Sequence, residues 1–266
     1  MEITMLGTGH AIVTECYNTC FVLSEEGKHL LVDGGGGIGL LRQFRHAGFA
    51  WSDMTEIFVT HKHLDHLGGI LWMLRMLCQS MSRGGGPSEA RIYGHDEMVK
   101  LIGDMAVMLL DHAAEAVLGD RLQLVEVKNG ETREILGHPA TFFDIGANKA
   151  KQFGFSMEYT PGRKLTCCGD EPFSDCERPY AEGADWLLHE AFCLYAEREI
   201  YKPYEKHHST VKDACELAEE LGVKNLLLYH TEDRHLPERK QLYTEEGRQY
   251  YHGNIFVPDD LETVTL

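Results

Sequence analysis

Residues 60–69 read Thr-His-Lys-His-Leu-Asp-His-Leu-Gly-Gly, and six consecutive positions of this segment, 61–66, contain four side chains that could bind a metal ion. The preceding segment, 56–59, is a short apolar and β-branched run that predicts a buried strand. The following segment, 70–74, is apolar and predicts the start of a helix. The four side chains therefore lie at a strand-to-helix junction; they are His61, His63, Asp65 and His66.

The spacing of these four side chains favours two neighbouring metal ions. In an extended segment alternate side chains point the same way, so His61 and His63 can converge on one ion. Asp65 and His66, at the turn into the helix, can bind a second ion beside it. Imidazole and carboxylate together suit Zn²⁺, and Mn²⁺, Fe²⁺ or Ni²⁺ could replace it. A solvated histidine-rich loop is the competing interpretation, and the flanking apolar segments make it the weaker one.

The run His61-Lys62-His63-Leu64-Asp65-His66 resembles the H-x-H-x-D-H signature of the metallo-β-lactamase fold. Other segments resemble further motifs of that fold, in the right order along most of the chain: 5–9, 31–37, 168–170 and 226–230. The resemblance implies an α/β fold, the four-layer αββα sandwich of two mixed β-sheets flanked by helices, in a single domain spanning residues 1–266. It also implies that Asp170 bridges the two ions and that His230 is the last ligand.

Two more segments narrow the resemblance to ribonuclease Z and its relatives, the branch that hydrolyses phosphodiesters. They are Leu188-His189-Glu190-Ala191 and His208-Ser209-Thr210. The implied reaction is attack of a metal-bridged hydroxide on a phosphodiester, with Asp65 holding the nucleophile and accepting its proton. His208, oriented by Glu190, would stabilise negative charge or protonate the leaving oxygen. Similarity to the family also implies a homodimer.

One position departs from the ribonuclease Z pattern. In those relatives a histidine lies five residues before a Phe-Gly-aromatic triplet; here the triplet begins at Phe153, and Asn148 stands in the histidine's place. His138 cannot replace it, because ten residues of extended chain span about 33 Å. We expect an Asn148 oxygen or water to complete a weaker or more open first site. The expected ligands are His61, His63, Asp170 and Asn148 for the first ion, and Asp65, His66, Asp170 and His230 for the second.

Charge and a missing segment argue against long RNA as the substrate. The formal net charge is −17 at pH 7, and an acidic surface repels a polyanion unless lysines and arginines cluster on it. Ribonuclease Z carries a long arm that grips transfer RNA, whereas only residues 156–163 separate Phe155 from Lys164 here, which predicts a tight hairpin. We therefore expect a small phosphodiester or nucleotide-type substrate.

Length and composition allow one well-packed domain. A chain of 266 residues with 43% hydrophobic residues can bury a substantial core. No apolar run reaches membrane-spanning length and the N-terminus is strand-like, without a basic leader, so we expect a cytoplasmic protein with no membrane partner. The eight cysteines show no regular spacing, which predicts reduced thiols rather than disulfides.

Hydrophobic periodicity predicts the elements that position the candidate residues. Strands are expected at 3–6, 20–23, 29–32, 122–127, 140–143, 184–188 and 225–229, and helices at 38–47, within 96–118 and from Ser209 or Thr210 through Leu221. Asp33, at a strand end, is expected to orient a ligand histidine rather than to bind an ion. The glycine loop 34–37 could bring its backbone near the metals or be a flexible turn. Glu171 could alter the charge of the pocket or face solvent.

Two other functions stay open. The same hydroxide attacks carbonyl carbon equally well, so a lactone or thioester hydrolase on this fold is one alternative. A metal- or nucleotide-binding module without catalysis is the other, because Asn148 could leave the first metal site half filled.

Overall fold

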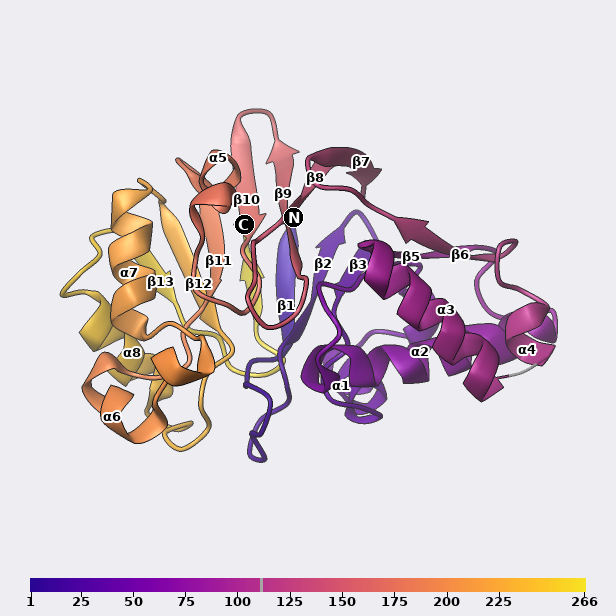
Figure 1. The fold of residues 1–266 in the computed structure, drawn as a ribbon, viewed down its shortest axis with the longest axis horizontal. Coiled ribbons are helices and arrows are strands. Elements are labelled where there is room, and N and C mark those ends of the chain that lie inside the picture. The colour runs from indigo at the N-terminus through magenta and orange to yellow at the C-terminus, as the bar shows by residue number, and fades with distance from the viewer. Residues whose placement is uncertain (111) are drawn as a thin grey trace. The chain divides into compact units, whose positions relative to one another are not determined.

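The computed structural model describes residues 1–110 and 112–266. These residues form two compact units, each with its own sheet (Figure 1). Unit 1 comprises Met1–Gly7, Tyr17–Lys128 and Leu261–Leu266, and unit 2 comprises Thr8–Cys16 and Asn129–Asp260. That the whole chain is one domain stays a prediction.

The sheet of unit 1 is mixed and has seven strands in the order β14-β1-β2-β3-β4-β5-β6. Strands β14, β1, β2 and β3 pair antiparallel, and β3 to β6 pair parallel. The parallel half brings the carboxyl ends of β3 and β4 to one edge, where Asp33 and the histidine-rich segment begin. The bounds are Glu2–Gly7 (β1), Cys20–Glu25 (β2), Lys28–Val32 (β3), Glu56–Phe58 (β4), Ala90–Gly94 (β5), Leu122–Glu126 (β6) and Thr263–Thr265 (β14).

The helices of unit 1 pack their apolar faces on this sheet. Helix α1 is followed by Gly48, whose φ of 83° is the left-handed conformation that glycine adopts without strain. Helices α2 and α3 pack against each other, and α2 buries Leu67, Ile70, Met73 and Leu74 in the core. The bounds are Gly39–Ala47 (α1), Trp51–Asp53 (η1), Leu64–Ser82 (α2), Asp96–Leu110 (α3) and His112–Glu115 (α4). The expected helices at 38–47 and within 96–118 are thus confirmed for the described residues.

The sheet of unit 2 is also mixed, with seven strands in the order β13-β12-β11-β10-β9-β8-β7. Strands β7 to β10 pair antiparallel, and β10 to β13 pair parallel. The bounds are Glu131–Ile135 (β7), His138–Asp144 (β8), Phe153–Thr160 (β9), Arg163–Cys167 (β10), Trp186–Glu190 (β11), Asn225–Tyr229 (β12) and Asn254–Phe256 (β13). The parallel half sends the carboxyl ends of β10, β11 and β12 to the same edge.

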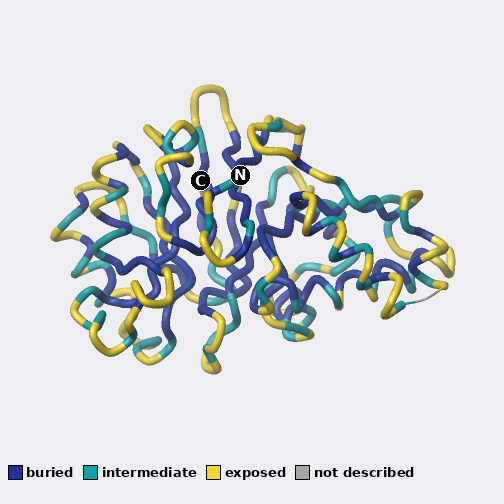
Figure 2. The backbone as a smooth tube through the Cα atoms, in the orientation of Figure 1, coloured by how far each residue is buried: buried dark blue, intermediate teal, exposed yellow. Residues whose placement is uncertain are grey.

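The predicted tight hairpin between β9 and β10 is present. Only Pro161 and Gly162 separate the two strands, and Gly162 has a φ of 75°, which favours glycine at a turn. The tip of this hairpin is exposed (Figure 2). The chain therefore has no inserted arm at this point.

The longest helix of unit 2, α7, begins as the sequence predicts. The Thr210 side chain accepts a hydrogen bond from the Asp213 backbone N–H, and the Asp213 carboxylate accepts one from the Thr210 backbone N–H at 2.8 Å. Its buried face joins the core that covers β11 and β12. The bounds are Asp175–Glu177 (η2), Arg178–Ala181 (α5), Tyr195–Glu197 (η3), Arg198–Tyr201 (α6), Tyr204–Lys206 (η4), Val211–Glu220 (α7) and Arg239–Gly247 (α8).

All eight cysteines are described, and each is a free thiol, as predicted. Among the described residues, no helix has both the length and the apolar character needed to cross a bilayer.

The carboxyl group of Glu177 in unit 2 is completely buried. Glu177 accepts a hydrogen bond from the Ser174 backbone N–H at 2.8 Å and lies beside the buried Cys168 thiol. Burial raises the pKa of Glu177 from 4.5 to about 8, against the opposing hydrogen bonds from Ser174 and Cys168. Between pH 4.5 and about 8, the side chain is therefore mostly protonated in the folded protein, whereas it is mostly ionised in the unfolded chain.

Replacing Glu177 by Gln should remove a pH dependence of stability. Below pH 4.5 the carboxyl is protonated in both states; as the pH rises to 8 the unfolded chain loses the proton first, so the free energy of unfolding falls by up to about 1.4 kcal/mol per pH unit. Urea unfolding between pH 5 and 8 should show that the free energy of unfolding of E177Q increases relative to that of the wild type as the pH rises. The exposed Glu182→Gln is the control, and a constant difference for E177Q would contradict the account.

Candidate functional site

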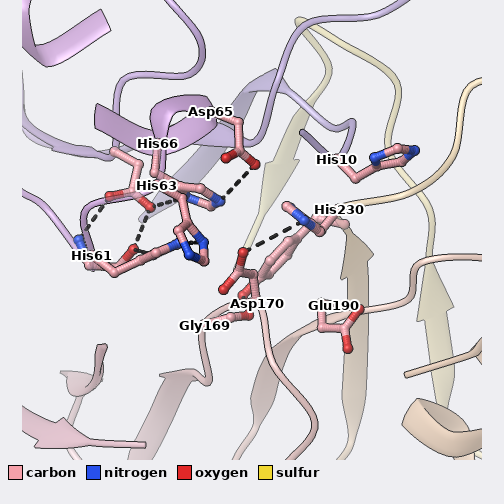
Figure 3. A network of polar contacts seen from close by, with 12 residues as sticks. His10, His61, His63, Asp65, His66, Gly169, Asp170, Glu190 and His230 are labelled. Atoms are coloured by element: carbon pink, nitrogen blue, oxygen red, sulfur yellow. Dashed lines mark hydrogen bonds and ion pairs between the residues drawn. The ribbon is translucent and has the colours of Figure 1, made fainter. Parts of the chain in front are cut away.

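The histidine-rich segment of unit 1 runs from the end of β4 into α2, as its spacing predicts. His63 is the residue before α2, in an extended conformation, and Asp65 and His66 lie in the first turn of the helix. His61 Nε2 lies 2.9 Å from His63 Nδ1 (Figure 3). Asp65 Oδ2 lies 3.4 Å from His66 Nε2. The structure thus gathers all four side chains into two adjacent pairs.

Asp33 holds this segment in position from the end of β3. Its carboxylate accepts hydrogen bonds from the Thr60 backbone N–H and hydroxyl, each at 2.8 Å, and from His66 Nδ1 at 2.7 Å. Because Nδ1 of His66 donates the proton, its Nε2 carries the lone pair that a metal ion requires. Asp33 adopts a φ of 58°, a conformation that costs a non-glycine residue energy and recurs at functional sites. Asp33 therefore orients a candidate ligand, as expected.

The first half of the glycine loop after Asp33 is packed against helix α2, whereas Gly36 is exposed in a turn. Gly34 N–H donates to the His66 carbonyl, and Gly69 N–H donates to the Gly35 carbonyl, both at 2.8 Å. A Cβ on Gly69 would lie 1.9 Å from the Gly34 carbonyl oxygen, so only glycine permits this approach. The loop fixes the first turn of α2, which carries Asp65 and His66.

The donor set of unit 1 fits a divalent metal ion. One ligand atom from each of Asp33, His61 and His66 lies within 4.8 Å of the others, and all three side chains are buried. Because Asp33 already accepts hydrogen bonds from Thr60 and His66, the candidate donors are the imidazoles of His61 and His66 and the Asp65 carboxylate beside His66; imidazole and carboxylate together suit Zn²⁺ and its neighbours among the transition metals. The Asp33–His66 hydrogen bond is the carboxylate–histidine arrangement that commonly supports such ligands.

A second group of candidate residues forms within unit 2. Asp170 follows β10 and His230 follows β12, and His230 Nε2 lies 3.6 Å from Asp170 Oδ2 (Figure 3). Tyr229 Oη donates to the Gly169 carbonyl and fixes the loop that carries Asp170. Burial raises the pKa of Tyr229 well above its usual value, so its hydroxyl stays protonated and can donate this hydrogen bond to the Gly169 carbonyl. His230, like Asp33, has a φ of 58°.

The residue that contacts Asp170 from the 145–152 loop is Gln152. Its Nε2 donates to Asp170 Oδ1 at 2.7 Å, and its side chain is buried. Asn148, by contrast, is exposed, and its backbone N–H donates to Glu171. Gln152 was not predicted from the sequence, in which its position one residue before the Phe-Gly-Phe triplet was the available signal. The role of Asn148 as a ligand stays a prediction.

Glu171 is buried and does not face solvent. Its two carboxylate oxygens accept the backbone N–H groups of Asn148 and Lys149, at 2.8 and 3.2 Å. Glu171 therefore anchors the loop that carries Gln152, which is a role that neither sequence alternative described.

His208 and Glu190 form a pair next to His230. His208 Nδ1 lies 3.5 Å from Glu190 Oε2, and its ring stacks on Phe192 with centroids 4.8 Å apart. The other Glu190 oxygen accepts the Ser209 backbone N–H. The His208 and His230 rings lie 5.2 Å apart. His208 and Glu190 thus lie within ion-pair distance without a hydrogen bond between these two atoms, and Glu190 is completely buried; that Glu190 orients His208 stays a prediction.

His10 is a histidine of this group that the sequence analysis did not identify. Its ring lies 4.4 Å from the Phe192 ring, tilted by 35°, and 6.3 Å from the His230 ring, centroid to centroid. Its backbone N–H donates to the Thr231 carbonyl at 3.0 Å. The only sequence signal was its position shortly after the first strand.

The structure therefore shows two candidate half-sites. The half-site of unit 1 contains Asp33, His61, His63, Asp65 and His66, and the half-site of unit 2 contains Asp170, His230, His208, Glu190 and Gln152. That the two half-sites hold the same pair of ions stays a prediction.

Replacing Asp33 by Asn should weaken metal binding by about 10- to 100-fold, because His66 loses the carboxylate that fixes its tautomer and orientation. Competition for zinc with a coloured chelator measures the change. Asp104→Asn, at an exposed aspartate paired with Lys100, is the control and should bind zinc as the wild type does. Equal affinity in D33N and the wild type would contradict the role given to Asp33.

Comparisons with known proteins agree with this fold. The family model described as anti-Pycsar protein Apyc1 matches residues 1–249. Ribonuclease Z of Methanothermobacter thermautotrophicus is 29% identical over 316 aligned positions, which cover 100% of this chain and 97% of the relative.

Solved structures give the fold. The metallo-β-lactamase fold protein YhfI from Bacillus subtilis matches with a TM-score of 0.79 at 16% identity, covering 99% of this chain and 98% of its own. The short form of human tRNase Z matches with a TM-score of 0.75 at 24% identity, covering 100% and 99%. The expected fold class is confirmed. Because the family model matches most of the length of this chain, the chain belongs to the family of anti-Pycsar protein Apyc1. It is a metallo-β-lactamase-fold protein related to ribonuclease Z.

Proposed function

We propose that this chain is a metal-dependent phosphodiesterase that hydrolyses a cyclic nucleotide. The observation that carries the proposal is the His208–Glu190 pair beside His230, which supplies a proton-transfer group next to a candidate metal ligand. Membership of a cyclic-nucleotide-degrading family supports the substrate class. A cyclic nucleotide is also the small, nucleotide-type phosphodiester that the sequence favours.

We propose that the two half-sites together hold two divalent ions, most simply Zn²⁺. The first ion would bind His61, His63 and Asp170, with Asn148 or water completing its shell. The second would bind Asp65, His66, Asp170 and His230. The support is the resemblance in sequence and the donor set of each half-site, in which carboxylates already contact the imidazoles. When bound, such ions supply an ionised water at neutral pH and polarise the phosphate.

The side chains of the chain would perform the proton transfers. Asp65 would hold the attacking water and accept its proton. His208, whose positive charge Glu190 would balance, would donate a proton to the leaving ribose oxygen as the cyclic phosphodiester opens. Stacking on Phe192 keeps the His208 ring in one orientation, which reduces the reorganisation needed in the reaction.

Two features favour a small substrate over an RNA. The turn of Pro161 and Gly162 joins β9 to β10 directly, leaving no arm there to grip a folded RNA. The net charge of −17 opposes a polyanion but permits one phosphate to reach the metals. The phosphodiester itself, rather than a long nucleic acid, would therefore be the group that is recognised.

Replacing His208 by Ala should lower turnover of a cyclic nucleotide by about 100- to 10,000-fold, because the leaving oxygen loses its proton donor. Zinc content should stay at the wild-type value, since His208 is not among the proposed ligands. His207→Ala is the matched control, because His207 is the neighbouring, exposed histidine, and it should retain wild-type turnover. Equal turnover in H208A and H207A would remove His208 from the mechanism.

A panel of substrates separates the proposed activity from its alternatives. We expect the zinc-loaded protein to hydrolyse 3′,5′-cyclic nucleotides and bis(p-nitrophenyl) phosphate far faster than a lactone, a thioester or a transfer RNA precursor. Faster cleavage of the lactone or thioester would establish the carbonyl hydrolase instead. A single tightly bound ion and no hydrolysis with any added divalent metal would favour the non-catalytic binding module.

A further inference from the structure

Unit 2 contains another group of metal-ligand types, made of Glu197, Glu232 and His235. Glu197 ends η3, whereas Glu232 and His235 lie in the loop after β12. One ligand atom from each lies within 4.8 Å of the others. None of the three belongs to the half-sites described above.

Glu232 is held with one carboxylate oxygen unsatisfied. Its Oε2 accepts hydrogen bonds from the Arg234 backbone N–H and from Tyr201 Oη, the latter at 3.2 Å. Its Oε1 is buried and accepts no hydrogen bond from any described residue. The side chain of Glu232 is almost completely buried, at 1% exposure. A buried carboxylate oxygen without a partner is costly unless a cation binds it.

Glu197 and His235 complete the group from the solvent side. His235 Nε2 lies 2.9 Å from Glu197 Oε1, and Glu197 Oε2 is buried without a partner among the described residues. The side chains of His235 and Glu197 are 31% and 19% exposed. An ion could therefore reach the group from solvent past these two side chains, with Glu232 at its base.

The charges of this group are not balanced by the protein. Among the described residues, no lysine or arginine forms an ion pair with Glu197 or Glu232, and His235 is the only ion-pair partner of Glu197. Two neighbouring carboxylates repel each other, and burying them without a cation is unfavourable. One imidazole and two carboxylates are a donor set that suits Zn²⁺ or Mn²⁺, with water in the remaining positions.

We propose that Glu197, Glu232 and His235 bind a further divalent cation, separate from the proposed pair. The ion would join η3 to the loop that follows His230. Glu232 N–H donates to the Phe192 carbonyl at 2.8 Å, and Phe192 stacks on His208. The ion would therefore stabilise the segments that carry His208 and His230.

Metal stoichiometry of the full chain tests this site. The wild type, Glu232→Gln and His235→Ala are dialysed to equilibrium against buffered zinc, and bound zinc is measured by mass spectrometry. We expect both variants to hold one zinc per chain fewer than the wild type. Glu219→Gln and His252→Ala are the matched controls, because Glu219 Oε1 and His252 Nδ1 form an exposed pair 3.0 Å apart, and both should bind as much zinc as the wild type. Equal zinc in the wild type and H235A would overturn the proposal.

Two further measurements keep the result unambiguous. His235 is partly exposed, so H235A should fold even if E232Q does not, and circular dichroism checks this. Asp170→Asn should release zinc from the proposed pair but leave the ion at Glu232, so D170N and the double variant D170N/H235A should still differ by one zinc. If that difference vanishes, the site does not exist, whatever the outcome of the activity assays.

Discussion

The hydrogen bonds received by the Asp33 carboxylate are the interaction on which the candidate site depends most. One side chain accepts from Thr60 twice and from His66 once, so it links the end of β3 to both ends of the histidine-rich segment. The same contact decides which nitrogen of His66 carries the lone pair. The glycines that follow Asp33 let the backbone pack against α2 and keep this contact in place. Because the carboxylate is buried, losing one donor would leave it with an uncompensated charge.

Features set by local spacing could be predicted from the sequence. The histidine-rich segment enters α2 where its apolar flanks indicate, and Asp33 orients His66 because a strand end places it there. The pairing of His208 with Glu190 followed from family resemblance, and the structure contains it. The short β9–β10 hairpin needed only the count of residues between two recognisable strands. In each case the information lies within a few neighbouring positions or in a known motif.

Contacts between distant segments could not be predicted in the same way. Gln152 contacts Asp170, and Glu171 binds the Asn148 backbone, yet both side chains only adjoin a motif, and adjacency does not indicate which distant group a side chain contacts. The group at Glu232 joins two loops whose conformations depend on tertiary packing. The motif position of Asn148 suggested a ligand, a role that stays a prediction, but did not indicate that Glu171 binds its backbone N–H. Such contacts depend on how loops close over a sheet, which sequence spacing does not encode.

The central claim is that the half-sites of the two units share one pair of ions. Anomalous diffraction from crystals of the wild-type protein loaded with zinc measures this directly. The account predicts two peaks about 3.5 to 4 Å apart, with the Asp170 carboxylate against both, His63 against one and His230 against the other. Zinc bound at only one of the two half-sites, or no pair of peaks next to Asp170, would contradict the account.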